Sequence, residues 1–550
     1  MSALYTGSLA PFAVLLWPLL IGLVPVVPRW RRPVLRVLPL APLPALVFAL
    51  AGAPGQVVLP DLMLGVELAA VPDGALFLGM TALVWVVAGW HAALTMDRGG
   101  PAGIFTSFWC LTLAGNLGVF LAADIVTFYL AFAAVSLAAW FLVVHDRTSA
   151  ALSAGRLYIT LAVVGEAALL IGLMIGAAAA EDLQISTVRA AFADAPLGQL
   201  GLALLVIAFG IKAGMVPLHV WLPVAHPAAP VPGSAVLSGA IVKAGLIGMI
   251  LFLPDGTRWS TVLVVLGLAG AFGAALWGLT QRNPKAVLAY STVSQMGLLL
   301  VLVGAGSGGV AYYALHHGLA KGALFLCVGL MALAGTQRQR RMVLLAAGLL
   351  ALSVAGLPLT GGALAKLAGK AGLSGGIAMA VTVSGVTTTL LLGWFLMRLA
   401  QISPKPEPAM RWRSLLAGGV LLGAVAMGLP WALWSGEVPL PRDYPIWPGN
   451  MLDGLWPVLA GLGLVFLASR FPLPEPPPSI MLDAITARKL RSLFRQPIAR
   501  NPGRHRFERP VIRRLLLVKR AESYLLRWSR AGSALVGVAF ALAGMIWLAI

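Results

Sequence analysis

The sequence has 550 residues, of which 59% are apolar and 11% are charged, and its formal net charge at pH 7 is +20. Soluble domains carry about 25% charged residues. An ordinary soluble enzyme is therefore excluded, and the composition predicts a membrane protein.

Apolar windows of about 20 residues, long enough to cross a hydrocarbon core roughly 30 Å thick, recur along the whole chain. We count about sixteen and predict an all-α polytopic membrane protein. The first window has no Ala-x-Ala cleavage site and is followed, not preceded, by arginines, so we expect a retained span and not a signal peptide. The windows lie near residues 10–27, 35–53, 74–95, 103–122, 124–143, 157–179, 199–221, 233–253, 259–280, 286–305, 309–333, 343–370, 374–397, 413–433, 453–470 and 531–550.

Basic residues gather in alternate loops between these windows. Loops with few basic residues separate the basic ones, and cytoplasmic loops are the ones enriched in Lys and Arg. We therefore expect the inner membrane of a prokaryote with the N- and C-termini outside, and we read the surplus charge as a topology signal and not as nucleic-acid binding. The basic loops are residues 29–36, 145–156, 281–285, 337–341 and 398–413.

The C-terminal region departs from this pattern. PLPEPPPS (472–479) is a breaker-rich linker, and about fifty residues dense in arginine follow it. Apolar residues recur at near-helical spacing within 511–530 against a basic face, as in an amphipathic helix lying on the cytoplasmic membrane surface. We expect this helix before the last span, either as a solvated basic linker or as a lateral brace against neighbouring subunits.

Charged and titratable side chains occur inside several spans. A charge at the bilayer centre costs at least about 2.5–3.5 kcal/mol, so such residues usually face a protein interior or water and mark a pathway. Burial disfavours the charged form of an amine, and histidine titrates near neutral pH, so a row of these groups bridged by water can carry protons. The candidates are Glu166, Lys212, Lys243, Lys321, Lys366, His219, His226 and His317. We expect Lys370 and His316 to be water-exposed neighbours of better candidates.

Two spans contain helix-breaking residues next to a lysine. Pro217 follows Lys212, and Pro358, Gly361 and Gly362 precede Lys366. Irregular backbone at membrane depth is tolerated where it lines a cavity or meets polar partners. Paired broken helices in two halves of a chain indicate a transporter built from internal repeats, although the lysine precedes the proline in one span and follows it in the other.

Four blocks of the sequence resemble a known family. They are KAGMVPLHVWLPVAHPAAPVPGSAVLSGAIVK within 210–243, NPKAVLAYSTVSQMG (283–297), HHGLAKGALFLCVG (316–329) and GLPLTGGALAK (356–366). Together they resemble the antiporter-like subunits of respiratory complex I, formate hydrogenlyase, hydrogenase-4 and the Mrp sodium/proton antiporters. The resemblance is strong over about residues 105–400. The sequence His-Pro-Ala-Ala-Pro in the first block is closest to the hydrogenase-type branch of the family.

The resemblance implies roles for individual residues. Lys212 matches the lysine of the broken seventh span, Lys243 the basic residue of the eighth, and Lys366 the terminal base of the broken twelfth. His317 and Lys321 fall in the HxxxK pattern of the eleventh. The family pairs the first lysine with a glutamate in the fifth span, but Ala133 stands at that position here. We predict that Glu166, on the next span, replaces the missing partner of Lys212.

The domains expected from these observations are N-terminal spans (1–102), a proton-transport core with internal repeats (103–400), C-terminal spans (401–470), the basic lateral segment (471–530) and a final span (531–550). The two cysteines stand alone and cannot hold an iron–sulfur cluster, so we expect no metal and no cofactor.

Three functions are compatible with the sequence. The first is a proton-translocating subunit driven by redox chemistry in partner membrane subunits. The second is an Mrp-type cation/proton antiporter, or an ion-coupled inorganic-carbon uptake subunit, with Na⁺ as a further ion. The third is a membrane enzyme or a scaffold, and the sequence contains no nucleophile or metal constellation that supports an enzyme.

Overall fold

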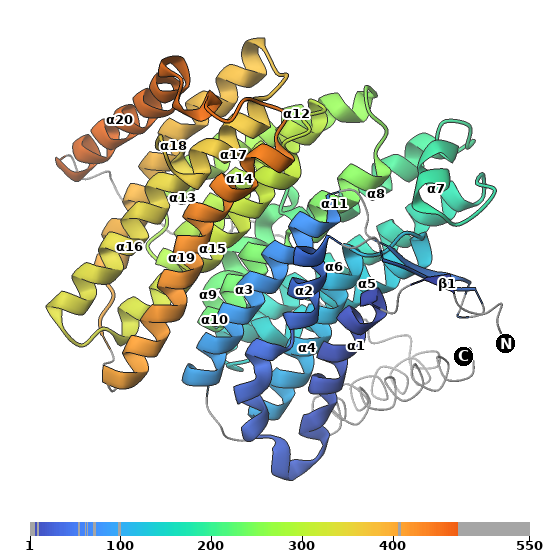
Figure 1. Cartoon of the computed structure of the whole chain (residues 1–550), viewed down its shortest axis with the longest axis horizontal. Coiled ribbons are helices and arrows are strands. Elements are labelled where there is room, and N and C mark those ends of the chain that lie inside the picture. Colours follow the sequence, from blue (N-terminus) through green and yellow to red (C-terminus); the bar gives the residue numbers. More distant parts are fainter. Residues whose placement is uncertain are drawn as a thin grey trace, which may run out of the picture.

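The computed structural model in Figure 1 describes residues 6–7, 10–52, 55–60, 62, 64–69, 73–96, 101–404 and 409–470. The helices of the N-terminal part are α1 (Ala10–Leu23), α2 (Leu43–Ala51), α3 (Gly74–Thr95), α4 (Pro101–Val119), α5 (Ile125–Val143), α6 (Ser149–Ala177) and α7 (Ile185–Ala191). The central helices are α8 (Gly198–Ala213), α9 (Leu222–Ala228), α10 (Val231–Val236), α11 (Lys243–Phe252), α12 (Arg258–Leu268), α13 (Ala275–Gly278), α14 (Pro284–Gly304) and α15 (Val310–Leu333). The remaining helices are α16 (Gln337–Ala355), α17 (Gly361–Lys370), α18 (Gly375–Ala400), α19 (Ala409–Glu437) and α20 (Pro448–Arg470).

Short helical segments of other types connect or interrupt these helices. The 3₁₀ segments are η1 (Val24–Val26), η2 (Pro28–Trp30), η3 (Pro33–Leu40), η4 (Leu218–Trp221) and η7 (Tyr444–Ile446). Two segments are π-helical, η5 (Leu237–Ile241) and η6 (Ala269–Ala274). Each π-helical segment lies inside a span, so it changes the direction in which the following side chains point.

The long helices lie side by side, with α16, α18 and α20 at one end of the molecule, α7 at the other, and α19 packed against α3 between them (Figure 1). Thirteen helical stretches in the described residues are long and apolar enough to cross a membrane. The apolar stretch Ala10–Val26 and the broken pair α16–α17 match two further predicted spans. The prediction of an all-α multi-pass membrane protein is therefore confirmed. The predicted amphipathic segment (471–530) and final span (531–550) lie outside the described residues, so the number sixteen stays a prediction.

A small three-stranded antiparallel sheet accompanies the helices, which the sequence analysis did not anticipate. Its strands are β1 (Thr6–Gly7), β2 (Gln56–Leu59) and β3 (Val66–Ala69), in the order β1-β2-β3. The carboxylate of Asp124 caps α5 and also accepts the backbone N–H of Glu67 in β3, at 2.7 Å. The sheet is thereby fixed to the start of α5.

Successive spans alternate in direction and give the molecule two faces. We call the face with the basic loops the basic face and the opposite one the far face. Contacts between loops agree with this alternation: Arg340 donates to the carbonyl of Ala400 on the basic face, while Arg189 pairs with Asp255 at 2.8 Å on the far face. The span α8–α9 therefore runs from the far face to the basic face, and α16–α17 runs in the opposite sense.

Both predicted broken helices are interrupted near the middle of their spans. The first helix of each pair ends in a glycine with positive φ, Gly214 at +73° after α8 and Gly356 at +97° after α16. In each case the N–H groups of the glycine and of the next residue bond back to the last helical turn, which is the Schellman arrangement. The helix thus ends before Pro217 and before Pro358, and α17 resumes at Gly361.

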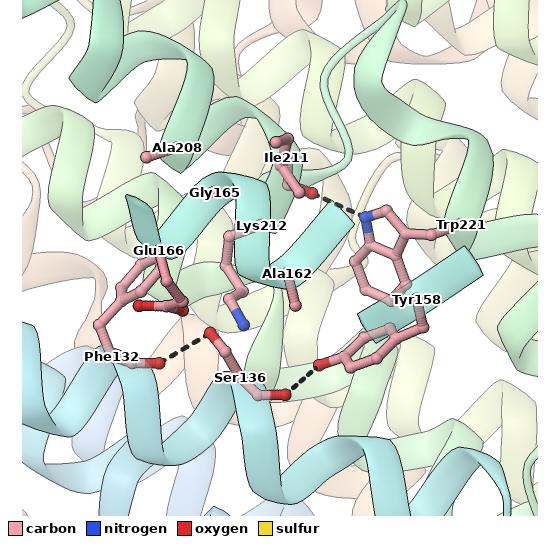
Figure 2. A pocket seen from close by; sticks show the side chains of 10 residues that line it. All are labelled: Phe132, Ser136, Tyr158, Ala162, Gly165, Glu166, Ala208, Ile211, Lys212 and Trp221. Carbon is pink, nitrogen blue, oxygen red and sulfur yellow. Dashed lines mark hydrogen bonds between the residues drawn. The ribbon is translucent and has the colours of Figure 1, made fainter. Parts of the chain in front are cut away.

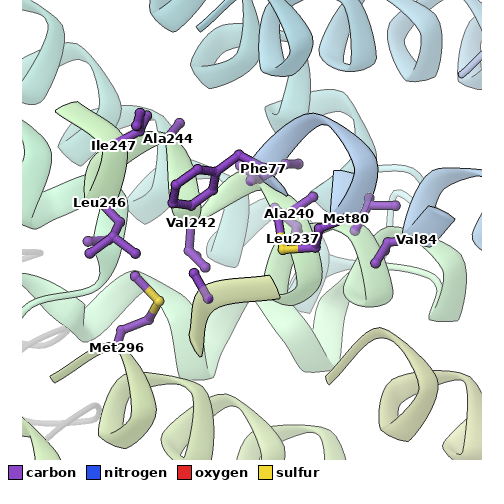
Figure 3. Packing of buried hydrophobic residues seen from close by; sticks show 14 of the residues in the cluster. Phe77, Met80, Val84, Leu237, Ala240, Val242, Ala244, Leu246, Ile247 and Met296 are labelled. Atoms are coloured by element: carbon purple, nitrogen blue, oxygen red, sulfur yellow. The ribbon is translucent and has the colours of Figure 1, made fainter. Parts of the chain in front are cut away.

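Close backbone approach brings the central helices together. A Cβ at Gly239 would lie 3.0 Å from the carbonyl oxygen of Gly318, and a Cβ at Gly318 would lie 2.6 Å from that of Gly239. These glycines let η5 and α15 touch, next to Lys243 and Lys321. Apolar side chains of α3, η5 and α11 pack around this contact (Figure 3).

Candidate functional site

Glu166 of α6 and Lys212 of α8 lie in the same small cavity, as Figure 2 shows. The cavity has a volume of about 10 Å³ and is also lined by Phe132 and Ser136 of α5, so it is close to the minimum size for one water molecule. The ammonium of Lys212 lies 5.1 Å from the centroid of the Phe132 ring. Ala133 is not among the residues that line the cavity.

The charges of Glu166 and Lys212 are close enough to interact. Within the described part of the chain, neither carboxylate oxygen of Glu166 has a hydrogen-bond partner, although both oxygens are buried. Buried polar atoms are normally paired with protein or ordered water.

Lys243 and Lys321 are fully buried, and each donates a hydrogen bond to a backbone carbonyl in one polar cluster of η5 and α14. Lys243 Nζ donates to the carbonyl of Ser238 at 2.7 Å, and the Ser238 hydroxyl is 2.7 Å from that of Thr292. The Thr292 hydroxyl donates to the carbonyl of Leu288 at 3.0 Å, and Lys321 Nζ donates to the same oxygen at 3.1 Å. A polar chain thus joins η5, α14 and α15 through an otherwise apolar region.

The predicted histidines lie in α15 or pack against α14 and α15. His317 precedes Lys321 by one turn of α15, and its ring is close enough to Lys243 and Lys321 for their charges to interact. The ring of His226 stacks on Phe325, with centroids 4.5 Å apart. His219 faces Tyr290 edge to face at 6.1 Å.

Several ring nitrogens of these histidines have no partner in the described residues. They are both nitrogens of His226 and His317 and Nδ1 of His219. Such atoms are sites at which water can continue a polar chain.

Lys366 lies in the second broken span, and its amine donates two hydrogen bonds. Its Nζ donates to the carbonyl of Ala355 at 2.8 Å and to the hydroxyl of Ser384 at 3.2 Å. His316 approaches Lys366 from α15, and its Nε2 lies 2.9 Å from the hydroxyl of Ser353. Our expectation that His316 is water-exposed is wrong, because only 1% of its surface is exposed. This histidine therefore links α15 with the second break.

Both broken spans place a lysine next to the C-terminal end of a helix. Lys212 lies in the last turn of α8, and Lys366 bonds the carbonyl of Ala355, the last residue of α16. The last carbonyls of a helix have no intrahelical partner and carry a partial negative charge. The breaks therefore provide a favourable position for an ammonium group inside an apolar region.

The structure places all eight predicted site residues in the interior. Glu166 and Lys212 share one cavity, Lys243, Lys321 and His317 lie around η5, α14 and α15, and Lys366 lies at the second break. His219 and His226 lie beside Tyr290 and Phe325. Sequence reasoning did not identify the hydroxyls of Ser238 and Thr292 between Lys243 and Lys321, or those of Ser353 and Ser384, which contact His316 and Lys366. Hydroxyl residues are common in membrane helices, so no sequence signal singles these four out.

The sequence matches a known family and several known proteins. The family described as NADH:quinone oxidoreductase/Mrp antiporter, TM, matches residues 122–391. The chain is 30% identical over 254 residues to hydrogenase-4 component B of Escherichia coli, and 33% identical over 242 residues to formate hydrogenlyase subunit 3 of the same organism. These alignments cover 42% and 40% of this chain, and 38% and 37% of the relatives, so the chain spans less than two fifths of their length.

A solved structure shares the fold. The Mrp complex from Dietzia sp. contains a chain that superposes with a TM-score of 0.71 at 22% identity, over 94% of this chain and 62% of that one. The matched residues 122–391 include all eight predicted site residues. The resemblance found in the sequence to this family of antiporter-like membrane subunits is therefore confirmed over residues 122–391.

Proposed function

We propose that this protein is a proton-translocating membrane subunit of a multi-subunit, redox-driven complex. Protons would move along Glu166, Lys212, Lys243, Lys321 and Lys366, with His219, His226 and His317 beside them. The redox chemistry would take place in partner subunits of the complex I or hydrogenase type. The similarity to subunits of hydrogenase-4 and formate hydrogenlyase supports this assignment.

The observation that carries the proposal is the central polar chain. Lys243 and Lys321 are 0% exposed, have no carboxylate hydrogen-bonded to them in the described residues, and are joined through hydroxyl and carbonyl groups of η5 and α14. Two amines in each other's field cannot both be charged without a large penalty. With one amine charged and the other neutral this penalty is avoided, and the proton would then be able to move from one amine to the other.

The test uses the full complex in inverted membrane vesicles, with a fluorescent dye that reports the pH gradient. Lys243→Ala removes a proton-carrying group, and we expect it to slow proton transport at least about tenfold, because acid–base groups typically contribute 10²–10⁴-fold. Arg338→Gln, at an exposed position in the first turn of α16, is the matched control and keeps normal transport. Equal transport by the two variants would contradict the proposal.

An Mrp-type cation/proton antiporter, or an ion-coupled inorganic-carbon uptake subunit, is the second candidate. The matched family includes antiporters, which supports this alternative. Proton movement that requires Na⁺ in the vesicles, in the absence of a redox substrate, would favour it. We further propose that the protein lies in the inner membrane of a prokaryote with the basic face in the cytoplasm, because basic loops remain on that side.

A further inference from the structure

A second cavity opens beside Lys366 on the side of the far face. It has a volume of about 30 Å³ and is lined by residues of α16, α17, α18, α20 and the loop before α20, so it has room for about one water molecule or slightly more. Three titratable side chains line it: Lys366, Lys370 and Asp453. Asp453 comes from α20, outside the family match and outside the set of residues predicted from the sequence.

The side chains in this cavity are held in a defined geometry. Lys370 Nζ lies 3.1 Å from Asp453 Oδ2 and donates to the hydroxyl of Thr382 at 3.1 Å. Lys366 and Lys370 are four residues apart on α17 and therefore share one face of that helix. Asp453 is thus attached to the same face that carries the last lysine of the pathway.

Exposure rises from the interior toward the far face along these groups. Lys366 is 7% exposed, whereas the side chains of Lys370 and Asp453 are 17% and 53% exposed. Lys370 is the last residue of α17, and Asp453 lies in the second turn of α20, so both sit where their helices reach the far face. Among the described residues that line the cavity beside Lys366, Asp453 is the only one with a carboxylate.

Resting on the proposed function, we propose that Asp453 is the group that accepts protons from Lys366 and releases them at the far face. The ammonium of Lys366 gives one proton to a water in the cavity, and that water gives one to the Asp453 carboxylate. The products are a neutral amine and a carboxylic acid, and the acid then loses the proton to bulk water. Lys370 positions the carboxylate at the mouth of the cavity through the ion pair.

Four variants of the full complex test this assignment in the vesicle assay. Asp453→Asn keeps the size of the side chain but cannot accept a proton, and we expect at least about a tenfold loss of transport. Asp453→Glu keeps the carboxylate and should retain most of the rate. Asp255→Asn, which removes the acid of an exposed ion pair on the same face, is the matched control and should leave the rate unchanged.

The double variant Lys370→Gln/Asp453→Asn separates proton acceptance from a structural ion pair. It removes both charges. If the ion pair has only a structural role, the single variant is slow because Lys370 is left unpaired, and removing the charge of Lys370 as well should restore transport. If Asp453 accepts protons, the double variant stays as slow as Asp453→Asn. Recovery of transport in the double variant would overturn the role of Asp453. Normal transport by Asp453→Asn, with Lys243→Ala inactive, would also overturn the role of Asp453 and leave the proposed function in place. Transport that is insensitive to Lys243→Ala as well would overturn the proposed function.

Discussion

Thr292 gives the most direct test of the central polar chain, because its hydroxyl lies between Ser238, which bonds Lys243, and the Leu288 carbonyl, which bonds Lys321. The hydroxyl is 2.7 Å from that of Ser238 and 3.0 Å from the carbonyl oxygen of Leu288. Thr292→Val retains the shape of the side chain and deletes both hydrogen bonds. It leaves the fully buried Ser238 hydroxyl without this partner.

The expected magnitude follows from these two bonds. A buried polar group left unsatisfied costs about 1–3 kcal/mol, so we expect the free energy of unfolding to fall by about that amount. If protons pass through the Thr292 hydroxyl, the valine variant deprives a proton in transit of a hydrogen bond to a charged group, which is worth about 1.5–3 kcal/mol. Because 1.36 kcal/mol corresponds to a tenfold change in rate, a barrier higher by that amount slows transport about 10- to 150-fold.

The assay compares Thr292→Val with Thr292→Ser in inverted vesicles that contain equal amounts of the complex. Serine keeps the hydroxyl and loses only a methyl group, so it controls for changes in packing. We expect Thr292→Ser to transport protons at close to the normal rate and Thr292→Val to be slow. Equal rates for the two variants would refute the role of this hydroxyl in conduction.

Two further substitutions address other parts of the pathway. Glu166→Gln removes the carboxylate next to Lys212 and should reduce proton transport at least about tenfold; an unchanged rate would show that Glu166 does not replace the missing glutamate. Gly356→Ala places a side chain at φ +97°, 2.8 Å from Cδ of Lys366, and should lower the free energy of unfolding by about 1–3 kcal/mol. In thermal unfolding of the purified complex, Gly428→Ala, where a Cβ would meet nothing within 4 Å, should show no comparable loss.

The buried charges could be predicted from the sequence because they contrast with their surroundings. A lysine within a long apolar run has few structural explanations, and the structure places Lys212, Lys243, Lys321 and Lys366 in the interior. The broken helices could also be predicted from their prolines. The glycines that actually end the first helix of each pair, Gly214 and Gly356, are hard to distinguish in a chain with 62 glycines.

The connections between the charges could not be predicted, because they depend on contacts between distant helices. The pairing of Ser238 with Thr292 requires η5 and α14 to lie side by side, and 54 residues separate them. Asp453 stands near the start of its span, where a carboxylate is ordinary in sequence. Its position beside Lys370 becomes evident only when α20 is packed next to α17 and α18.

The directions of the broken spans explain why their lysines stand on opposite sides of the break in sequence. The span α8–α9 runs from the far face to the basic face, so Lys212, which precedes its break, lies on the far side of it. The span α16–α17 runs the other way, so Lys366, which follows its break, also lies on the far side. The reversed order is therefore what an inverted repeat requires. In both spans an amine lies next to the C-terminal end of a helix, whose partial negative charge is favourable for an ammonium group.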